Sequence, residues 1–141
     1  MKRIIFFILL LALITSSALI LTSCGAGGFE DVDAKLLEIG FTHVDGADAD
    51  DALRATVNNF ISLGKLDTDI YEEYRDKIVG GMIYERTTFF AYVIEFSDGE
   101  YLTSFVGEDK IDALKASGYV YGNVLVTTNS LAVVKAVRTL D

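Results

Sequence analysis

The sequence predicts a small α+β domain over residues 29–141, with helices packed mainly on one face of a small antiparallel sheet. Apolar residues recur at spacings of three and four in several stretches, which is typical of helices. Shorter stretches rich in β-branched and aromatic residues lie between them and favour strands. The Gly122-Asn123 pair separates two such strand stretches as a two-residue hairpin turn would. We therefore expect neighbouring strands to run antiparallel.

The first half of the domain is expected to contain three helices and a short strand. Phe29, Val32, Leu36 and Ile39 have helical spacing, and Gly40 is suited to follow the end of that helix because glycine tolerates a left-handed backbone. The three helices are expected at residues 29–39, at residues 48–63, and from Asp67 to the Gly80-Gly81 pair, with the strand at residues 41–44.

The second half is expected to begin with strand. Residues 82–96 are rich in β-branched and aromatic side chains and predict two strands bent near Glu85–Thr87, or one long strand. A helix over residues 109–117 is expected to end at Gly118, and Ser130 is placed to cap a last helix over residues 131–140.

The segment Ser97–Glu100 has two interpretations. Asp98-Gly99 between apolar runs is a hairpin turn signal. Ser97 and Glu100 also have the spacing of a capping box, in which two side chains bond the first free amides of a helix. Leu102 and Phe105 then have helical spacing, so we favour the helix over the hairpin.

The beginning of the chain has the plan of a secretory signal. Lys2 and Arg3 supply a positive start, residues 4–14 are apolar, and small residues follow. Leu21-Thr22-Ser23-Cys24 then resembles the lipobox of bacterial lipoproteins, in which a leucine, two small residues and a cysteine mark the cleavage and lipidation site.

The resemblance implies a division of the chain and a location. Residues 1–23 would be a signal peptide cleaved between Ser23 and Cys24, and residues 24–28 a lipidated cysteine with a glycine-rich tether. The Cys24 sulfur would carry a diacylglycerol with chains such as palmitate, and two acyl chains suffice for stable anchoring. The protein would then be held on the extracytoplasmic face of the cell membrane, in an envelope of one membrane or two.

The domain also resembles, in general form, the small uncharacterised lipoproteins of Gram-positive bacteria. A strand ending in Glu95-Phe96, a helix, the Gly-Asn hairpin and a last helix carry this likeness. The resemblance conveys no activity, because none is assigned to that group.

Two other interpretations of the N-terminal region remain. Residues 4–21 would just cross a hydrocarbon core as a helix, at about 1.5 Å per residue, and so form an uncleaved anchor. The hydroxyl residues near the end of this run and the small residues before Cys24 argue against a retained helix. A reactive or disulfide-bonded Cys24 has no second cysteine in the chain to pair with.

The charge balance excludes nucleic acid as an expected partner. The chain has 12 basic and 21 acidic residues, and cleavage after Ser23 would remove the basic Lys2 and Arg3. An acidic surface repels phosphate backbones and anionic lipid headgroups.

The residues that most often carry chemistry are scarce. His43 is the single histidine, and a general base or metal ligand would need an orienting carboxylate or further ligands. Asp45, Asp48, Asp50 and Asp51 suggest a calcium loop by their charge, but alternate ligand positions fall on alanines. We expect Asp48, Asp50 and Asp51 to stabilise a helix N-terminus instead. No catalytic residue, metal site or cofactor is predicted.

The sequence thus predicts a non-enzymatic, membrane-anchored binding domain that takes an envelope protein or a small ligand on one face of its sheet. Tyr119 and Tyr121 alternate beside the Gly-Asn turn and are the candidate exposed aromatic pair for that ligand. The alternatives are a carboxylate-dependent envelope enzyme, for example one acting on cell-wall sugars, and a structural surface protein without a ligand.

Overall fold

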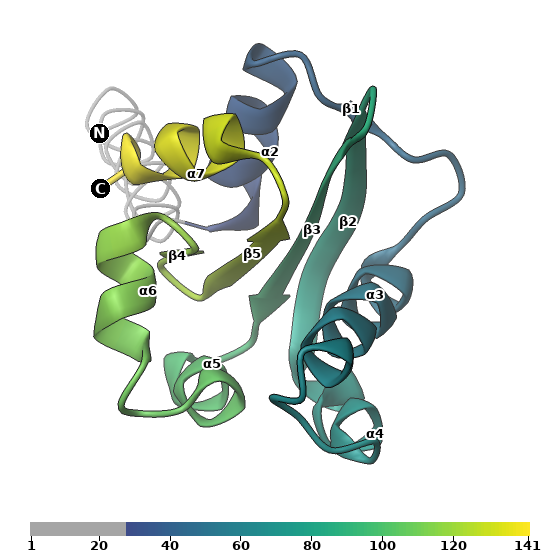
Figure 1. Cartoon of the computed structure of the whole chain (residues 1–141), viewed down its shortest axis with the longest axis vertical. Helices are drawn as coiled ribbons and strands as arrows, with labels where there is room; N and C mark the ends of the chain where they lie inside the picture. The colour runs from purple at the N-terminus through teal and green to yellow at the C-terminus, as the bar shows by residue number, and fades with distance from the viewer. Residues whose placement is uncertain (1–27) are drawn as a thin grey trace, which may run out of the picture.

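The computed structural model describes residues 28–141 and arranges them around an antiparallel sheet (Figure 1). Within this part of the chain the sheet has five strands in the order β1-β2-β3-β5-β4. They span β1 (Thr42–His43), β2 (Ile78–Arg86), β3 (Phe89–Phe96), β4 (Val120–Tyr121) and β5 (Val124–Thr128). The α+β class and the antiparallel pairing predicted from the sequence are confirmed.

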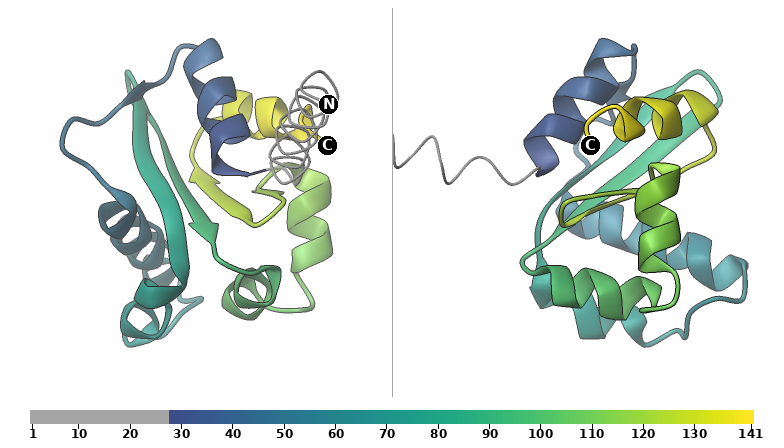
Figure 2. Two further views of the ribbon diagram at one scale, coloured as in Figure 1. Left: turned by 180° about the vertical axis from the view of Figure 1, so that it is seen from behind. Right: turned by 90° about the vertical axis from the view of Figure 1, so that its left-hand side faces the viewer.

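The six α-helices of the described chain cover both faces of the sheet, four on one face and two on the other (Figures 1 and 2). We call the first the α3 face, since it packs against α3, α4, α5 and α6, and the second the α7 face, since it packs against α2 and α7. Their bounds are α2 (Phe29–Glu38), α3 (Ala49–Ser62), α4 (Ile70–Tyr74), α5 (Gly99–Val106), α6 (Ile111–Ser117) and α7 (Leu131–Arg138).

Side-chain alternation along β3 separates two hydrophobic cores. Ile94 and Phe96 join the core of the α3 face, whereas Ala91 and Val93 join that of the α7 face. The same alternation on β5 sends Leu125 to the α3 face and Val124 to the α7 face. The strands are therefore buried on both sides, which explains why β3 is almost continuously apolar.

The glycine that ends α6 and the turn of the last hairpin were predicted correctly. Gly118 follows α6 with a φ of 85°, and a side chain there would collide with the carbonyl oxygen of Val134. The Gly122-Asn123 turn joins β4 to β5 as predicted, with Gly122 at a φ of 56°. Residues 82–96 belong to two strands, and the turn between them lies at Thr87, whose φ is 59°.

The predicted third helix is wrong in its second half. The α4 helix ends at Tyr74, a 3₁₀ turn follows, and β2 begins at Ile78 and passes through Gly80 and Gly81. A Cβ on Gly81 would lie 2.8 Å from the carbonyl oxygen of Val93 and 3.2 Å from the Cα of Ala49. Gly81 is therefore needed for the close approach of α3 to the sheet, not to end a helix.

The favoured interpretation of Ser97–Glu100 is confirmed, with a different capping residue. The α5 helix begins at Gly99, and the Asp98 carboxylate accepts a hydrogen bond of 2.8 Å from the amide of Glu100. Ser97 instead donates its amide to the carbonyl of Lys77 at the end of the sheet.

No helix among residues 28–141 is both long enough and apolar enough to cross a bilayer. The predicted signal peptide, the cleavage site at Ser23 and the lipidated Cys24 lie outside the described residues.

Candidate ligand-binding site

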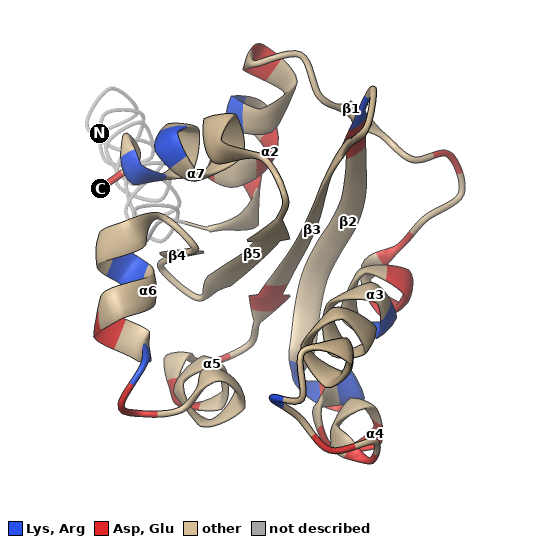
Figure 3. Cartoon of the chain, in the orientation of Figure 1, with Lys and Arg blue, Asp and Glu red and all other residues tan. Residues whose placement is uncertain are grey.

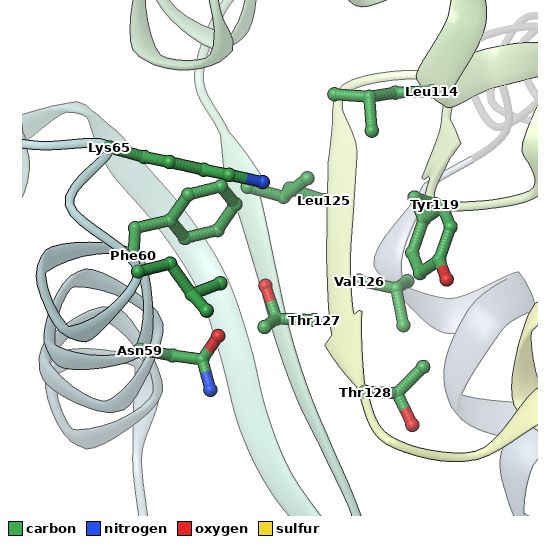
Figure 4. A pocket seen from close by; sticks show the side chains of 10 residues that line it. Asn59, Phe60, Lys65, Leu114, Tyr119, Leu125, Val126, Thr127 and Thr128 are labelled. Carbon is green, nitrogen blue, oxygen red and sulfur yellow. The ribbon is translucent and has the colours of Figure 1, made fainter.

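An apolar pocket of about 310 Å³ lies on the α3 face, between the end of α3 and strand β5 (Figure 4). Its walls come from four segments that are distant in the sequence. They are Asn59, Phe60, Leu63 and Lys65 at the end of α3 and just after it, Leu114 of α6, Tyr119 before β4, and Leu125–Thr128 of β5.

The α3 wall is the end of that helix's apolar stripe. Leu53 and Val57 are fully buried, and Phe60 continues their helical spacing to the rim of the core. The Phe60 ring packs edge-to-face on Phe105, with 6.0 Å between the ring centroids, and this contact fixes its orientation beside the pocket. Leu63 caps the helix and is 62% exposed, although it is a large apolar residue.

The β5 wall contains a buried hydroxyl without a partner. Thr127 follows Leu125 by two residues and so faces the α3 side of the sheet. Its Oγ1 is buried and makes no hydrogen bond to any residue of the described chain. An unsatisfied buried hydroxyl costs about 1–3 kcal/mol, so a native protein rarely keeps one without a reason.

Next to the pocket, strand β3 carries a pair of stacked aromatic rings. Tyr92 lies opposite Thr127 in the ladder between β3 and β5. The ring of Phe90 stacks on that of Tyr92, with the centroids 4.5 Å apart and the planes 19° apart. Both rings are half-buried, and in Figure 1 the β2–β3 hairpin extends beyond α3 at this end of the sheet. The helices of the α3 face thus leave part of it uncovered.

A second apolar pocket of about 260 Å³ adjoins the first. The two pockets share Phe60, Lys65 and Leu114, and the second continues toward Phe105 of α5 and Lys110. Lysines are the only charged residues among the side chains that line either pocket. Both pockets therefore combine apolar walls with positive charge.

The predicted tyrosine pair is divided between two environments. Tyr119 lies just before β4 and lines the first pocket, where its carbonyl oxygen accepts a hydrogen bond of 2.8 Å from the amide of Val126. Tyr121 packs on the core of the α7 face and points its hydroxyl at Asp31, 3.4 Å away. Burial and the nearby Asp31 carboxylate raise the pKa of Tyr121. Only Tyr119 is placed at the pocket.

His43 has a carboxylate partner that the sequence did not reveal. Its Nε2 lies 2.6 Å from Oδ1 of Asp33, and the Tyr84 hydroxyl donates to the same oxygen at 2.6 Å. Burial and this hydrogen bond both raise the pKa of Tyr84. Asp33 belongs to α2, His43 to β1 and Tyr84 to β2, so the cluster fastens α2 to the edge of the sheet.

The aspartates before and within α3 stabilise that helix, as predicted. Asp48 accepts a hydrogen bond from the amide of Asp51, and Asp51 accepts one from the amide of Asp48. Hydrogen bonds from Tyr71 and Arg54 lower the pKa of Asp50. Across residues 28–141 no three or more His, Cys, Asp or Glu side chains are grouped to hold a metal ion.

Carboxylates line two other hollows of the surface. Glu100 and Glu108 border a shallow one of about 690 Å³ beside α5. Asp31 and Glu95 border another of about 410 Å³ beside the start of α2, where Glu95 accepts a hydrogen bond of 3.3 Å from the amide of Phe29.

The residues that make the apolar pocket were not predicted, apart from Tyr119. Phe60 lies in the helix predicted over residues 48–63, and no local pattern distinguishes Lys65 or Thr127 from surface residues. Their association depends on contacts between segments far apart in the chain. Comparison with known proteins adds no further assignment, since the chain matches no protein-family model, no curated protein and no solved structure.

Proposed function

We propose that this chain is a lipoprotein, anchored through Cys24 on the extracytoplasmic face of the membrane, whose domain binds a small apolar ligand without catalysing a reaction. The lipobox-like residues 21–24 support the anchor, and the helix α2 begins only a few residues later, at Phe29. The apolar pocket between α3 and β5 supports the binding role, because ligand sites are concave, largely apolar and carry few polar groups.

The single observation that carries the binding role is the Thr127 hydroxyl. It is buried beside an apolar pocket and lacks a hydrogen-bond partner in the described chain. A ligand with an apolar body and one polar atom would fill the pocket and satisfy the hydroxyl together, which removes the cost of leaving it unpaired. A concave site of this kind suits a small ligand better than the flat patch of a protein partner.

The anchor is tested by the mass of the protein. The full chain is expressed in a bacterium, extracted from the membrane and compared with a Cys24→Ala variant. We expect a product that begins at Cys24 and carries the added mass of a diacylglyceryl group, and we expect the variant to lose that mass. A product that retains Met1 and carries no lipid would refute the anchor.

The pocket is tested with octanol, a neutral probe that has one apolar chain and one hydroxyl. Binding is measured by ligand-observed NMR on the membrane-extracted protein in nanodiscs, with empty nanodiscs as the blank. Asn59→Trp is the blocking variant, because Asn59 lines the pocket and a larger side chain there would occupy its space. We expect octanol to bind the wild type and not the variant. Equal binding to both would remove the pocket as the site.

The rival proposal is an envelope enzyme that uses carboxylates. The hollow bordered by Glu100 and Glu108 favours it, because two carboxylates flanking a cleft are the usual machinery of glycoside hydrolysis. Hydrolysis of cell-wall glycan by the wild type, abolished in the double variant Glu100→Gln and Glu108→Gln, would establish this rival. Absence of hydrolysis by the wild type leaves the binding role as the better account.

A further inference from the structure

The binding role proposed above leaves the chemistry of the ligand open. We infer that the ligand is an anionic amphiphile, with an apolar body held between α3 and β5 and an anionic head paired with Lys65. This inference rests on the proposed function and deepens it, because it assigns a chemical class to the ligand.

The charge lining the two apolar pockets is opposite to that of the protein. The chain has 21 acidic residues against 12 basic ones, and Figure 3 shows acidic residues on most helices and connecting loops of the described chain. No carboxylate lines either apolar pocket, whereas Lys65 lines both and Lys110 lines the second. An anion therefore finds here a local positive charge on an otherwise repulsive surface.

Lys65 is positioned by the end of α3. Gly64 adopts a φ of 68°, and the amide of Lys65 donates a hydrogen bond of 3.0 Å to the carbonyl of Phe60. This turn fixes the backbone of Lys65 beside the aromatic wall of the pocket. Figure 4 shows the Lys65 side chain extended past Phe60 toward β5.

The Lys65 ammonium is available to a ligand. It forms no ion pair and donates no side-chain hydrogen bond within residues 28–141, in contrast to Lys35, which pairs with Glu38 at 3.0 Å. Lys110 is likewise without an ion pair in this range, but both its ammonium and the Asp109 carboxylate lie within 4.0 Å of the position that a Cβ on Gly107 would take. Lys65 is therefore the stronger candidate to bind the head of the ligand.

The polar groups are arranged at two depths. The Thr127 hydroxyl is buried on the β5 wall, whereas Lys65 is exposed at the rim. A head group at the rim can keep part of its hydration while it pairs with the ammonium, which avoids the large cost of burying a charge. The body of the ligand then covers Phe60 and Leu114, the residues that both pockets share along with Lys65, and its one polar atom pairs with the Thr127 hydroxyl.

The test compares probes that share one chain and differ in the head. Octanoate, octanol and octylamine are titrated against the membrane-extracted protein in nanodiscs of zwitterionic lipid, with octyl phosphate as a second anion. We expect octanoate to bind about threefold to tenfold more tightly than octanol, and octylamine more weakly than either, because an exposed ion pair contributes modestly. Tighter binding of octyl phosphate would point to a lipid phosphate as the natural head, and tighter binding of octanoate to a free carboxylate.

Lys65→Gln is the deciding variant, and Lys135→Gln on the exposed surface of α7 is its matched control. We expect Lys65→Gln to lower octanoate affinity to that of octanol and to leave octanol binding unchanged, while Lys135→Gln changes neither. Equal binding of octanoate and octanol, or equal effects of the two variants, would overturn the anionic head and leave the binding role intact. If neither probe bound the wild type, the anionic head and the binding role would both fail.

Discussion

The two faces of the sheet differ in how completely helices cover them. On the α7 face, α2 and α7 close over a core made largely of valines, in which Val93, Val124 and Val133 have no exposed surface. On the α3 face, four helices surround larger side chains, including Phe96 and Phe105, and two apolar pockets lie at the rim. Both faces therefore have a packed core, and the two apolar pockets lie on the α3 face.

Two neighbouring threonines of β5 show the difference on a smaller scale. Thr128 faces the α7 side, where its hydroxyl donates to the carbonyl of Phe90 and accepts a hydrogen bond of 3.0 Å from the amide of Ser130. Thr127 faces the α3 side, and its buried hydroxyl has no partner in the described chain. Both threonines line the first pocket, but only the hydroxyl on the α7 side has hydrogen-bond partners in the described chain.

Shortening a leucine on each face should give very different losses of stability. Leu36 of α2 is fully buried on the α7 face, so Leu36→Ala is expected to lower the free energy of unfolding by about 2–5 kcal/mol. Leu63 is 62% exposed at the pocket, so Leu63→Ala is expected to change stability by about 0.5 kcal/mol or less. Denaturant unfolding measures both, and equal losses would contradict the distinction between the faces.

Adding a methyl group at Gly81 should disturb the packing of α3 against the sheet. The new Cβ would meet the backbone of Val93 and Ala49, neither of which can move freely, so we expect a loss of about 1–3 kcal/mol. Gly80→Ala is the matched control, because its nearest neighbour is the flexible end of Glu95, at 3.2 Å. Thermal unfolding compares the two, and a control that is as unstable as Gly81→Ala would refute the close-approach explanation.

Removing the Tyr84 hydroxyl should change how stability depends on pH. The pKa of Tyr84 is raised by burial and by Asp33, so folding favours its neutral form. The stability that neutral Tyr84 contributes is fully present below the pKa of about 10 that tyrosine has in the unfolded chain, and it is lost as the pH rises above that value. Tyr84→Phe should cost about 1–2 kcal/mol at neutral pH through the lost hydrogen bond to Asp33.

The same variant should lose less stability than the wild type as the pH is raised beyond about 10, because its phenyl ring cannot ionise. Tyr71 and Tyr121, whose pKa values are also raised, remain in both proteins. Urea unfolding across this alkaline range is the measurement. Parallel pH profiles for the two proteins would show that Tyr84 does not contribute to the alkaline loss.

Replacing a threonine hydroxyl by a methyl group should change stability less at Thr127, on the α3 face, than at Thr128. Thr127→Val removes an unsatisfied hydroxyl and is expected to change stability by about 0.5 kcal/mol or less, or to stabilise the unliganded protein. Thr128→Val removes satisfied hydrogen bonds and is expected to cost about 1 kcal/mol. Calorimetry compares them, and a larger loss for Thr127→Val would mean that its hydroxyl has a structural partner.

The sequence predicted those parts of the fold that local signals determine. Gly118 and the Gly122-Asn123 turn impose their own backbone conformations, so the end of α6 and the last hairpin were predicted correctly. Gly80 and Gly81 misled the prediction, because glycine stops a helix and permits close packing of a strand equally well. Only the contacts with Val93 and Ala49, both distant in the sequence, distinguish the two roles.

The candidate site was largely beyond prediction for the same reason. Lys65 follows a helix-ending glycine and Thr127 lies in an ordinary strand, so neither has a local signal of function. The pairing of His43 with Asp33 likewise depends on the docking of α2 against the sheet edge. Tyr119 was chosen for its place beside a turn, and the structure locates it at the pocket without its expected companion Tyr121.

Mapping a bound probe onto the two faces tests the distinction between them. The protein in nanodiscs is labelled at leucine and valine methyl groups and titrated with octanoate by NMR. We expect chemical-shift changes at Leu63, Leu114 and Leu125 and unchanged signals from Leu36 and Val133 on the α7 face. Chemical-shift changes centred on α2 and α7, or spread evenly over both faces, would contradict the proposal that the ligand binds on the α3 face.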